Sequence, residues 1–118
     1  MDTNDFKQTL APFFWVEHDD YFSVCLYADN VAAYQAVFDS RADEGFEGSG
    51  YDWTSLAVVF VAEQLPELAE IIEFDPEAGM FCAYCSDEQA LKTFVLAFKE
   101  ALENKELILD IFSRAELD

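Results

Sequence analysis

Basic residues are scarce in this sequence. Its 118 residues include 6 Lys and Arg against 25 Asp and Glu, a formal net charge of −19, and Arg41 is the only Lys or Arg between Gln8 and Leu91. Nucleic acid is bound through Lys and Arg that displace phosphate counterions, so this composition argues against it as a partner. An anionic membrane surface is disfavoured for the same reason. The charge favours a protein partner with a cationic surface, or serves solubility alone.

Long apolar runs and export signals are also missing. The sequence has no uninterrupted apolar stretch of about 18 residues, the length of a membrane span. Asp2 and Asp5 occupy the N-terminal region where a signal peptide needs a basic and then an apolar stretch. We therefore expect a cytosolic protein that does not associate with membranes.

Cysteine is limited to three residues, Cys25, Cys82 and Cys85. An odd number without export signals indicates free buried thiols rather than a disulfide framework. The Cys82 to Cys85 spacing occurs in redox and zinc half-motifs, but no second pair accompanies it, and within a strand the two side chains point to opposite faces. We interpret the cysteines as structural and predict that Cys82 is buried and unreactive.

Patterns typical of catalytic and metal sites are missing as well. His18, the only histidine, lies in a turn beside Asp19 and Asp20, where we expect a surface side chain rather than a triad member or a metal ligand. Neither these two aspartates nor Asp75 with Glu77 have calcium-loop spacing, and no glycine loop leads into a Lys. We expect no catalytic residue, no metal and no cofactor.

Apolar residues, by contrast, are plentiful. Hydrophobic residues make up 53% of the chain and aromatic residues 16%, with twelve Phe. This composition is far from that of a disordered chain, and the length is that of one domain. We predict a single folded domain over residues 1–118, with residues 1–10 and 113–118 frayed.

Two β-hairpins and several helices are indicated by the pattern. Strands are expected over 13–17, 21–27, 72–75 and 80–85, with turn residues between the members of each pair. Helices are expected over 31–42, 51–65, 66–71 and 87–103. Asp29 or Asn30 caps the first helix, a capping box of Ser86 and Gln89 begins the last, and Asn104 ends it. Residues 107–112 form an apolar segment that fits either a helix or a strand.

The order of these elements, ββααββα, predicts an α+β fold. We expect an antiparallel four-stranded sheet with helices packed on one face. An internal duplication is a further hypothesis, because residues 24–27 resemble residues 81–84 and a helix with similar apolar spacing follows each stretch.

The segment 43–53 combines acidic and aromatic residues with three of the four glycines. Exposed aromatic rings among charges are typical of protein-binding hot spots. The alternative is that Trp53 and Phe46 fold back into the core, with Tyr51 at the lip of the loop. The candidate partner-binding residues are Glu44, Phe46, Glu47, Tyr51, Asp52 and Trp53.

Two stretches of the chain are similar to a known family. They are GFEGSGYDWTSLAVVF, from Gly45 to Phe60, and FDPEAGMFCAYCSDEQALKTF, from Phe74 to Phe94, with the step LPEL at 65–68 between them. Over residues 22–101 the chain resembles the immunity protein 51 family of bacterial polymorphic toxin systems. The resemblance implies a cytosolic antitoxin without catalytic activity that binds a cognate toxin domain and blocks it. It identifies neither the toxin nor the residues that bind it.

Three hypotheses about function follow. In the first, an immunity protein occludes its toxin through the loop at residues 44–53, and the acidic surface meets a basic toxin surface. In the second, an acidic adaptor or regulator binds a basic cellular protein. In the third, disfavoured because the nucleophile and ligand constellations are missing, the chain is a small thiol or metal enzyme. The neighbouring gene distinguishes the first two hypotheses, and metal analysis tests the third.

Overall fold

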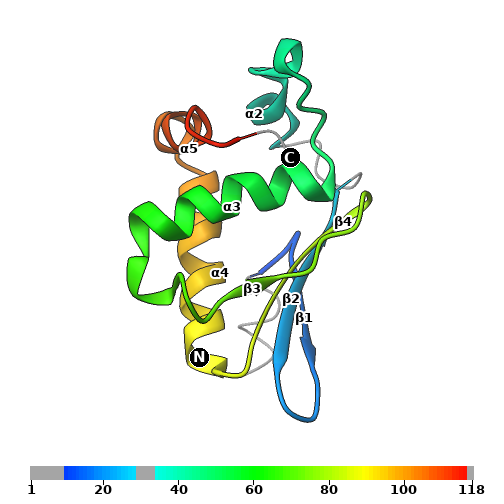
Figure 1. Cartoon of the computed structure of the whole chain (residues 1–118), viewed down its shortest axis with the longest axis vertical. Coiled ribbons are helices and arrows are strands. Elements are labelled where there is room, and N and C mark those ends of the chain that lie inside the picture. The colour runs from blue at the N-terminus through cyan, green and yellow to red at the C-terminus, as the bar shows by residue number, and fades with distance from the viewer. Residues whose placement is uncertain (1–9, 29–33, 117–118) are drawn as a thin grey trace.

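A computed structural model describes residues 10–28 and 34–116, and its fold is the predicted α+β arrangement (Figure 1). The elements are β1 (Phe14–Glu17), β2 (Phe22–Tyr27), α2 (Gln35–Asp39), the 3-10 helix η3 (Ala42–Glu44), α3 (Gly50–Gln64), the 3-10 helix η4 (Pro66–Leu68), β3 (Glu73–Phe74), β4 (Met80–Cys85), α4 (Glu88–Leu102) and α5 (Lys105–Phe112). The expected cap at Asp29 or Asn30 lies outside the described residues.

The four strands form one antiparallel sheet in the order β1-β2-β4-β3, which confirms the predicted sheet. The two hairpins meet through β2 and β4, so these inner strands are paired on both sides. The third strand is shorter than predicted. Ile72 is buried and donates its backbone N–H to the carbonyl of Leu68 in the preceding turn, so it is not part of the ladder.

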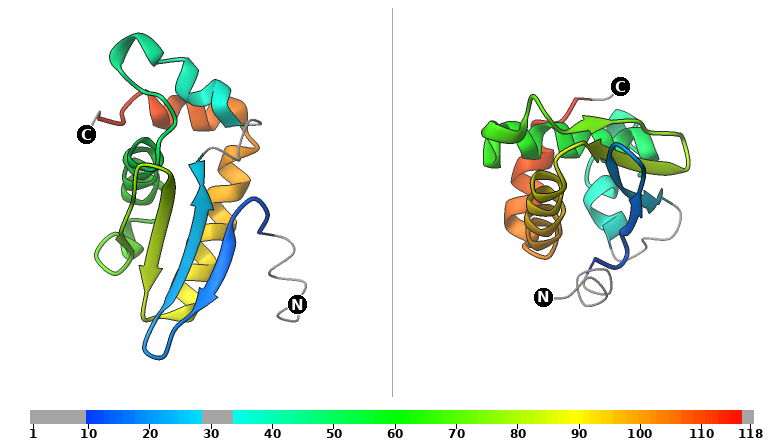
Figure 2. Two further views of the ribbon diagram at one scale, coloured as in Figure 1. Left: turned by 90° about the vertical axis from the view of Figure 1, so that its right-hand side faces the viewer. Right: turned by 90° about the horizontal axis from the view of Figure 1, so that it is seen from below.

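The helices α3 and α4 cover one face of this sheet (Figures 1 and 2). In the left view of Figure 2 the strands lie in front of α4, and no described helix lies on their near side. The helix α5 packs against α3 and α4 at the end of the helical layer. The sheet therefore has a covered face and an open face within the described part of the chain.

The core between the sheet and the helices is built around aromatic rings. Trp53 of α3 is fully buried, and its ring lies within 6.5 Å, centroid to centroid, of Phe13, Phe38, Phe81 and Phe98. Phe46 is buried as well. The alternative in which these two aromatic residues fold back into the core is thus the correct one.

Helix boundaries differ from the predictions where a neighbouring polar side chain makes the cap. Asp87, not Ser86, begins α4, because its carboxylate accepts a hydrogen bond from the N–H of Ala90 at 3.1 Å. Asn104, expected only to end a helix, caps α5 by accepting from the N–H of Leu107 at 3.2 Å. The unassigned segment 107–112 is thus helical, and the helix expected over 66–71 is limited to one 3-10 turn.

Parts of the expected frayed ends are packed. Leu10 and Ala115 are both buried. The Arg41 guanidinium donates to the carbonyls of Phe112 and Ala115 at 2.6 and 2.7 Å, which fastens the end of α5 to the segment after α2. None of the described helices has the length and apolar character needed to cross a bilayer.

Candidate partner-binding site on the open sheet face

The open face of the sheet is hollowed into a groove of about 540 Å³. We call it the open-face groove. Its lining comes from β1, β2, β4 and the segments beside them: Phe14, Val16, His18, Tyr21, Ser23, Cys25, Tyr27, Asp75, Met80, Cys82 and Tyr84.

Strand alternation explains why these residues share one face. Successive side chains of a strand point to opposite sides, so Cys82 lies in the groove while its neighbours Phe81 and Ala83 are fully buried beneath the helices. The register of β2 against β4 places Cys25 opposite Cys82 and Tyr27 opposite Met80. The groove floor is therefore made by paired residues of the two inner strands.

Aromatic side chains gather at both ends of the groove. At one end the rings of Phe14 and Tyr27 stack with centroids 5.1 Å apart. At the other end His18 stacks on Tyr21 at 4.1 Å, and Tyr21 contacts Tyr84 edge-on at 5.8 Å. Tyr27 is 54% exposed and Tyr21 40% exposed. Exposed aromatic surface of this kind is unfavourable in water and is typical of a binding site.

One rim of the groove is acidic. Along the edge of β4, the backbone of Glu73 is paired with that of Tyr84, and the backbone of Glu77 with that of Met80. Between them, the N–H of Asp75 donates a hydrogen bond to the carbonyl of Cys82 at 2.9 Å. Because they are two residues apart along an extended segment, these three exposed carboxylates lie on the same face. We call them the acidic rim.

The sheet itself supplies no Lys or Arg to pair with the acidic rim. The segments 14–27 and 73–85, which contain all four strands and the turns within the hairpins, hold no Lys or Arg. The hydroxyl of Tyr84 donates to Glu73 Oε2 at 3.1 Å, and this hydrogen bond raises the pKa of Tyr84. The groove therefore offers a negative potential beside apolar rings, which suits a cationic partner.

The burial predicted for the cysteines holds for Cys25 and Cys85 but not for Cys82. Cys25 is buried, but Cys82 is only half-buried and lies on the groove floor, with the two sulfur atoms 3.1 Å apart. The Cys25 thiol donates a hydrogen bond to the sulfur of Cys82, which raises the pKa of Cys25 and lowers that of Cys82. The prediction of a buried Cys82 is wrong, because β4 directs this side chain to the open face of the sheet, where no described helix covers it. Cys85 does lie on the opposite face, buried.

Three of the six residues predicted from the loop are buried. Phe46 and Trp53 belong to the core, and Asp52 is 5% exposed. One carboxylate oxygen of Asp52 accepts from the backbone N–H groups of Glu47, Gly48 and Ser49 at 2.7, 2.8 and 3.3 Å, and the Ser49 hydroxyl accepts from the N–H of Asp52. This capping box shapes the loop and starts α3. These three side chains are not available on the surface.

The other three predicted residues are exposed but do not form one patch with the buried ones. Glu44 makes a bidentate pair with Arg41, with both contacts at 2.8 Å. Glu47 is exposed, and Tyr51 is 43% exposed.

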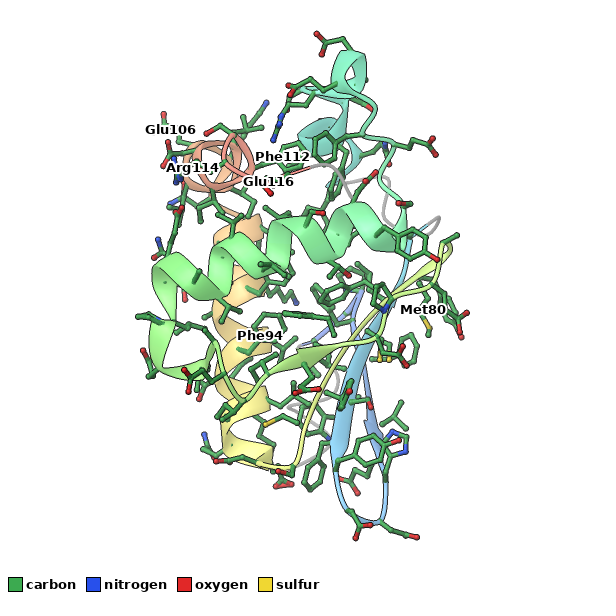
Figure 3. All side chains as sticks on the ribbon, viewed as in Figure 1. Met80, Phe94, Glu106, Phe112, Arg114 and Glu116 are labelled. Atoms are coloured by element: carbon green, nitrogen blue, oxygen red, sulfur yellow. The ribbon has the colours of Figure 1, made fainter. Side chains whose placement is uncertain are left out.

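The start of α3 packs on the turn at the Met80 end of the groove. The N–H of Gly50 donates a hydrogen bond to the carbonyl of Ala78 at 2.9 Å. A Cβ at Gly50 would lie only 1.9 Å from the backbone oxygen of Glu77. Tyr51 follows directly in the chain, so it lies beside this end of the groove. In Figure 3, Met80 lies on the side of the molecule away from Arg114 and Glu106 of the α5 region.

The groove residues were missed by sequence reasoning because both faces of β4 look similar in sequence. The buried set of alternate residues in β4 is Phe81, Ala83 and Cys85. It is no more apolar than the aromatic and sulfur-containing residues on the groove side, such as Met80 and Tyr84. The available signal was Ser23 within the otherwise apolar run of β2, together with the acidic residues at every second position from 73 to 77. Within the described residues, no group of three or more His, Cys, Asp or Glu is arranged to hold a metal ion.

Comparison with curated proteins and with solved structures returned no match. The model of one family, immunity protein 51, matches residues 13–117, nearly the whole length of the chain. That range includes every strand of the sheet and all residues of the open-face groove. The chain therefore belongs to the immunity protein 51 family.

Proposed function

We propose that this protein is an immunity protein that binds one cognate toxin domain in the cytosol and neutralises it by stoichiometric occlusion. Membership of the immunity protein 51 family supports a role in a toxin system. The observation that carries the proposal is the open sheet face, where exposed aromatic rings lie beside an acidic rim and the strand segments hold no Lys or Arg.

The groove supplies both parts of a protein-binding surface. Tyr27 and Tyr84 present ring surface at its two ends, and rigid aromatic residues in desolvated pockets dominate the affinity of many interfaces. The acidic rim (Glu73, Asp75 and Glu77) attracts a basic toxin surface from a distance and speeds association.

The contact surface extends beyond the groove. A standard interface covers about 800 Å² on each side, more than a groove of this size provides. Glu47 and Tyr51, the exposed residues of the predicted loop nearest the turn after β3, continue the acidic and aromatic surface past Met80. We therefore include both in the toxin-binding surface and leave out Phe46, Asp52 and Trp53, which are buried.

Co-expression with the toxin domain encoded beside this gene tests the function. Cells that carry both proteins should grow, and the purified proteins should form a one-to-one complex. If the toxin neither binds nor loses toxicity, the proposed function is wrong. The acidic adaptor hypothesis then gains support if a basic cellular protein binds the groove instead.

Paired variants test the surface separately from the function. We expect the double variant Tyr27→Ala with Tyr84→Ala to weaken toxin binding about thirtyfold or more, equivalent to about 2 kcal/mol. Val58→Ala with Leu96→Ala removes exposed apolar side chains from α3 and α4 and should bind like the parent. If the two double variants bind the toxin with equal affinity and both have unchanged melting curves, the toxin contacts another surface.

A further inference from the structure

Two thiols face each other at the centre of the open-face groove. Cys25 of β2 and Cys82 of β4 are partners in the antiparallel register, and their sulfur atoms are 3.1 Å apart. Cys82 is partly exposed to solvent in the groove, whereas Cys25 is 5% exposed. The third cysteine, Cys85, is buried on the other face of the sheet and is not part of this pair.

The register makes this pair suitable for a direct covalent bond. Ala28 donates its N–H to the carbonyl of Gly79 at 2.9 Å, which marks these two residues as a hydrogen-bonded pair. Such pairs alternate along the ladder, so Cys25 and Cys82, three positions along, form a non-hydrogen-bonded pair with Cα atoms about 4.5 Å apart. A disulfide needs Cα atoms roughly 4.4–6.8 Å apart, so the strands need no rearrangement to accept one.

We propose that Cys25 and Cys82 form a reversible modification site, at which a small neutral peroxide converts the two thiols into a cross-strand disulfide on the floor of the open-face groove. The inference does not depend on the proposed toxin binding, because its test uses the protein alone.

The reaction needs only the two thiols and the oxidant. The Cys82 thiolate attacks one oxygen of hydrogen peroxide, the O–O bond breaks, and the hydroxide that leaves takes up a proton to become water. This step leaves a sulfenic acid on Cys82. The Cys25 sulfur then attacks the Cys82 sulfur, the S–O bond breaks, and a second water leaves with the Cys25 proton. In sum, two thiols and one peroxide give one disulfide and two waters, and two electrons pass from sulfur to oxygen.

The surroundings decide which sulfur reacts first and with which oxidant. Cys82 is the accessible sulfur, and the hydrogen bond from Cys25 lowers its pKa, so it provides the attacking thiolate. The carboxylates of Asp75 and Glu77 oppose negative charge at the same place. Anionic oxidants such as glutathione disulfide are therefore repelled, while uncharged peroxide is not.

Thiol mapping of the full-length protein tests the inference. The reduced protein is treated with hydrogen peroxide, the remaining thiols are alkylated after denaturation, and the products are analysed by intact mass and peptide mapping. We expect a monomer that has lost two hydrogen atoms, with Cys85 as the only alkylated cysteine and full reversal by dithiothreitol. Glutathione disulfide at the same concentration should react more slowly.

Single variants provide the controls. Cys85→Ala should form the disulfide like the parent, whereas Cys25→Ser should fail to lose the two hydrogen atoms and should instead oxidise further or cross-link between molecules at Cys82. The inference is overturned if the folded parent keeps all three thiols, if the bridge includes Cys85, or if Cys82 of the parent is oxidised to the sulfinic acid without bridging. The result from the parent decides the matter even if a variant does not fold.

Discussion

The two faces of the central strands have different tasks, although their residues alternate along the same backbone. In β4, Phe81, Ala83 and Cys85 are buried under α3 and α4, whereas Met80, Cys82 and Tyr84 line the open-face groove. The covered face contributes apolar burial, which drives folding. The open face leaves aromatic rings and the Cys82 thiol in contact with water. Stability and recognition can therefore be changed independently by substituting alternate residues of a single strand.

The largest difference between the two faces is expected when one residue on each face of β4 is replaced by Ala. Phe81→Ala should lower the free energy of unfolding by about 3–5 kcal/mol, because it leaves a cavity among the rings around Trp53. Tyr84→Ala on the open face should change it by no more than about 1 kcal/mol. Urea unfolding of both variants measures the difference. Similar losses would mean that the open face is also part of the core.

The buried carboxylate of the loop should come next in size. Asp52→Ala removes the acceptor for three backbone N–H groups and should cost about 2–3 kcal/mol of unfolding free energy. Glu47→Gln, five residues away and exposed, should be nearly neutral for stability. Thermal melts of the two variants distinguish a structural role for this loop from a purely binding role. A neutral Asp52→Ala variant would contradict the structural role.

Two glycines near the Met80 end of the groove make a matched pair. A Cβ on Gly50 would lie 1.9 and 2.3 Å from the backbone oxygens of Glu77 and Met80, whereas a Cβ on Gly79 meets nothing within 4 Å. Gly50→Ala should therefore cost about 1–3 kcal/mol by forcing α3 away from the turn, while Gly79→Ala should not. Chemical denaturation of both proteins checks this. Equal stabilities would show that α3 is not tightly seated on the turn.

The smallest effect is expected from an ion-pair network in the helical layer. Arg114 contacts Glu63 at 2.6 Å and Asp110 at 3.0 Å, and its hydrogen bonds lower the pKa of both carboxyls. A lowered folded-state pKa gives stability that is present above the unfolded pKa of about 4 and is lost as the pH falls through the folded value.

The substitution Arg114→Gln should therefore reduce stability slightly at neutral pH, and the deficit should vanish in acid. Because all three groups are exposed, the effect should be small and weakened by salt. Melting curves of parent and variant across acidic and neutral pH measure it. A deficit that grows in acid would contradict the assignment.

Local signals in the sequence were sufficient for most of the fold. The bounds of β4 follow from the turn residues before Met80 and the apolar run up to Cys85, and the apolar spacing of the last long helix identified α4. Caps were less predictable. Ser86 and Asp87 are both good capping residues, and only the backbone conformation at residue 87 decides between them.

The binding surface was harder to predict because it depends on tertiary pairing. Counting aromatic residues in the segment 43–53 does not reveal that Phe46 and Trp53 are buried, since burial is decided by α5 and the sheet. The groove exists only because β2 and β4, more than fifty residues apart, pair in a register that sets Cys25 against Cys82. The hypothesis of an internal duplication stays a prediction, although the two similar stretches are these paired strands.

Association kinetics with the toxin domain encoded beside this gene show whether the toxin binds the open face. The triple variant Glu73→Gln, Asp75→Asn and Glu77→Gln removes the acidic rim. A control, Glu67→Gln, Glu100→Gln and Glu106→Gln, removes the same charge from exposed positions on η4, α4 and α5. We expect the rim variant to associate with the toxin about tenfold or more slowly at low salt, with a weaker salt dependence, while the control stays close to the parent. Equal slowing by both variants, or none by the rim variant, would contradict the claim that the toxin binds the open face.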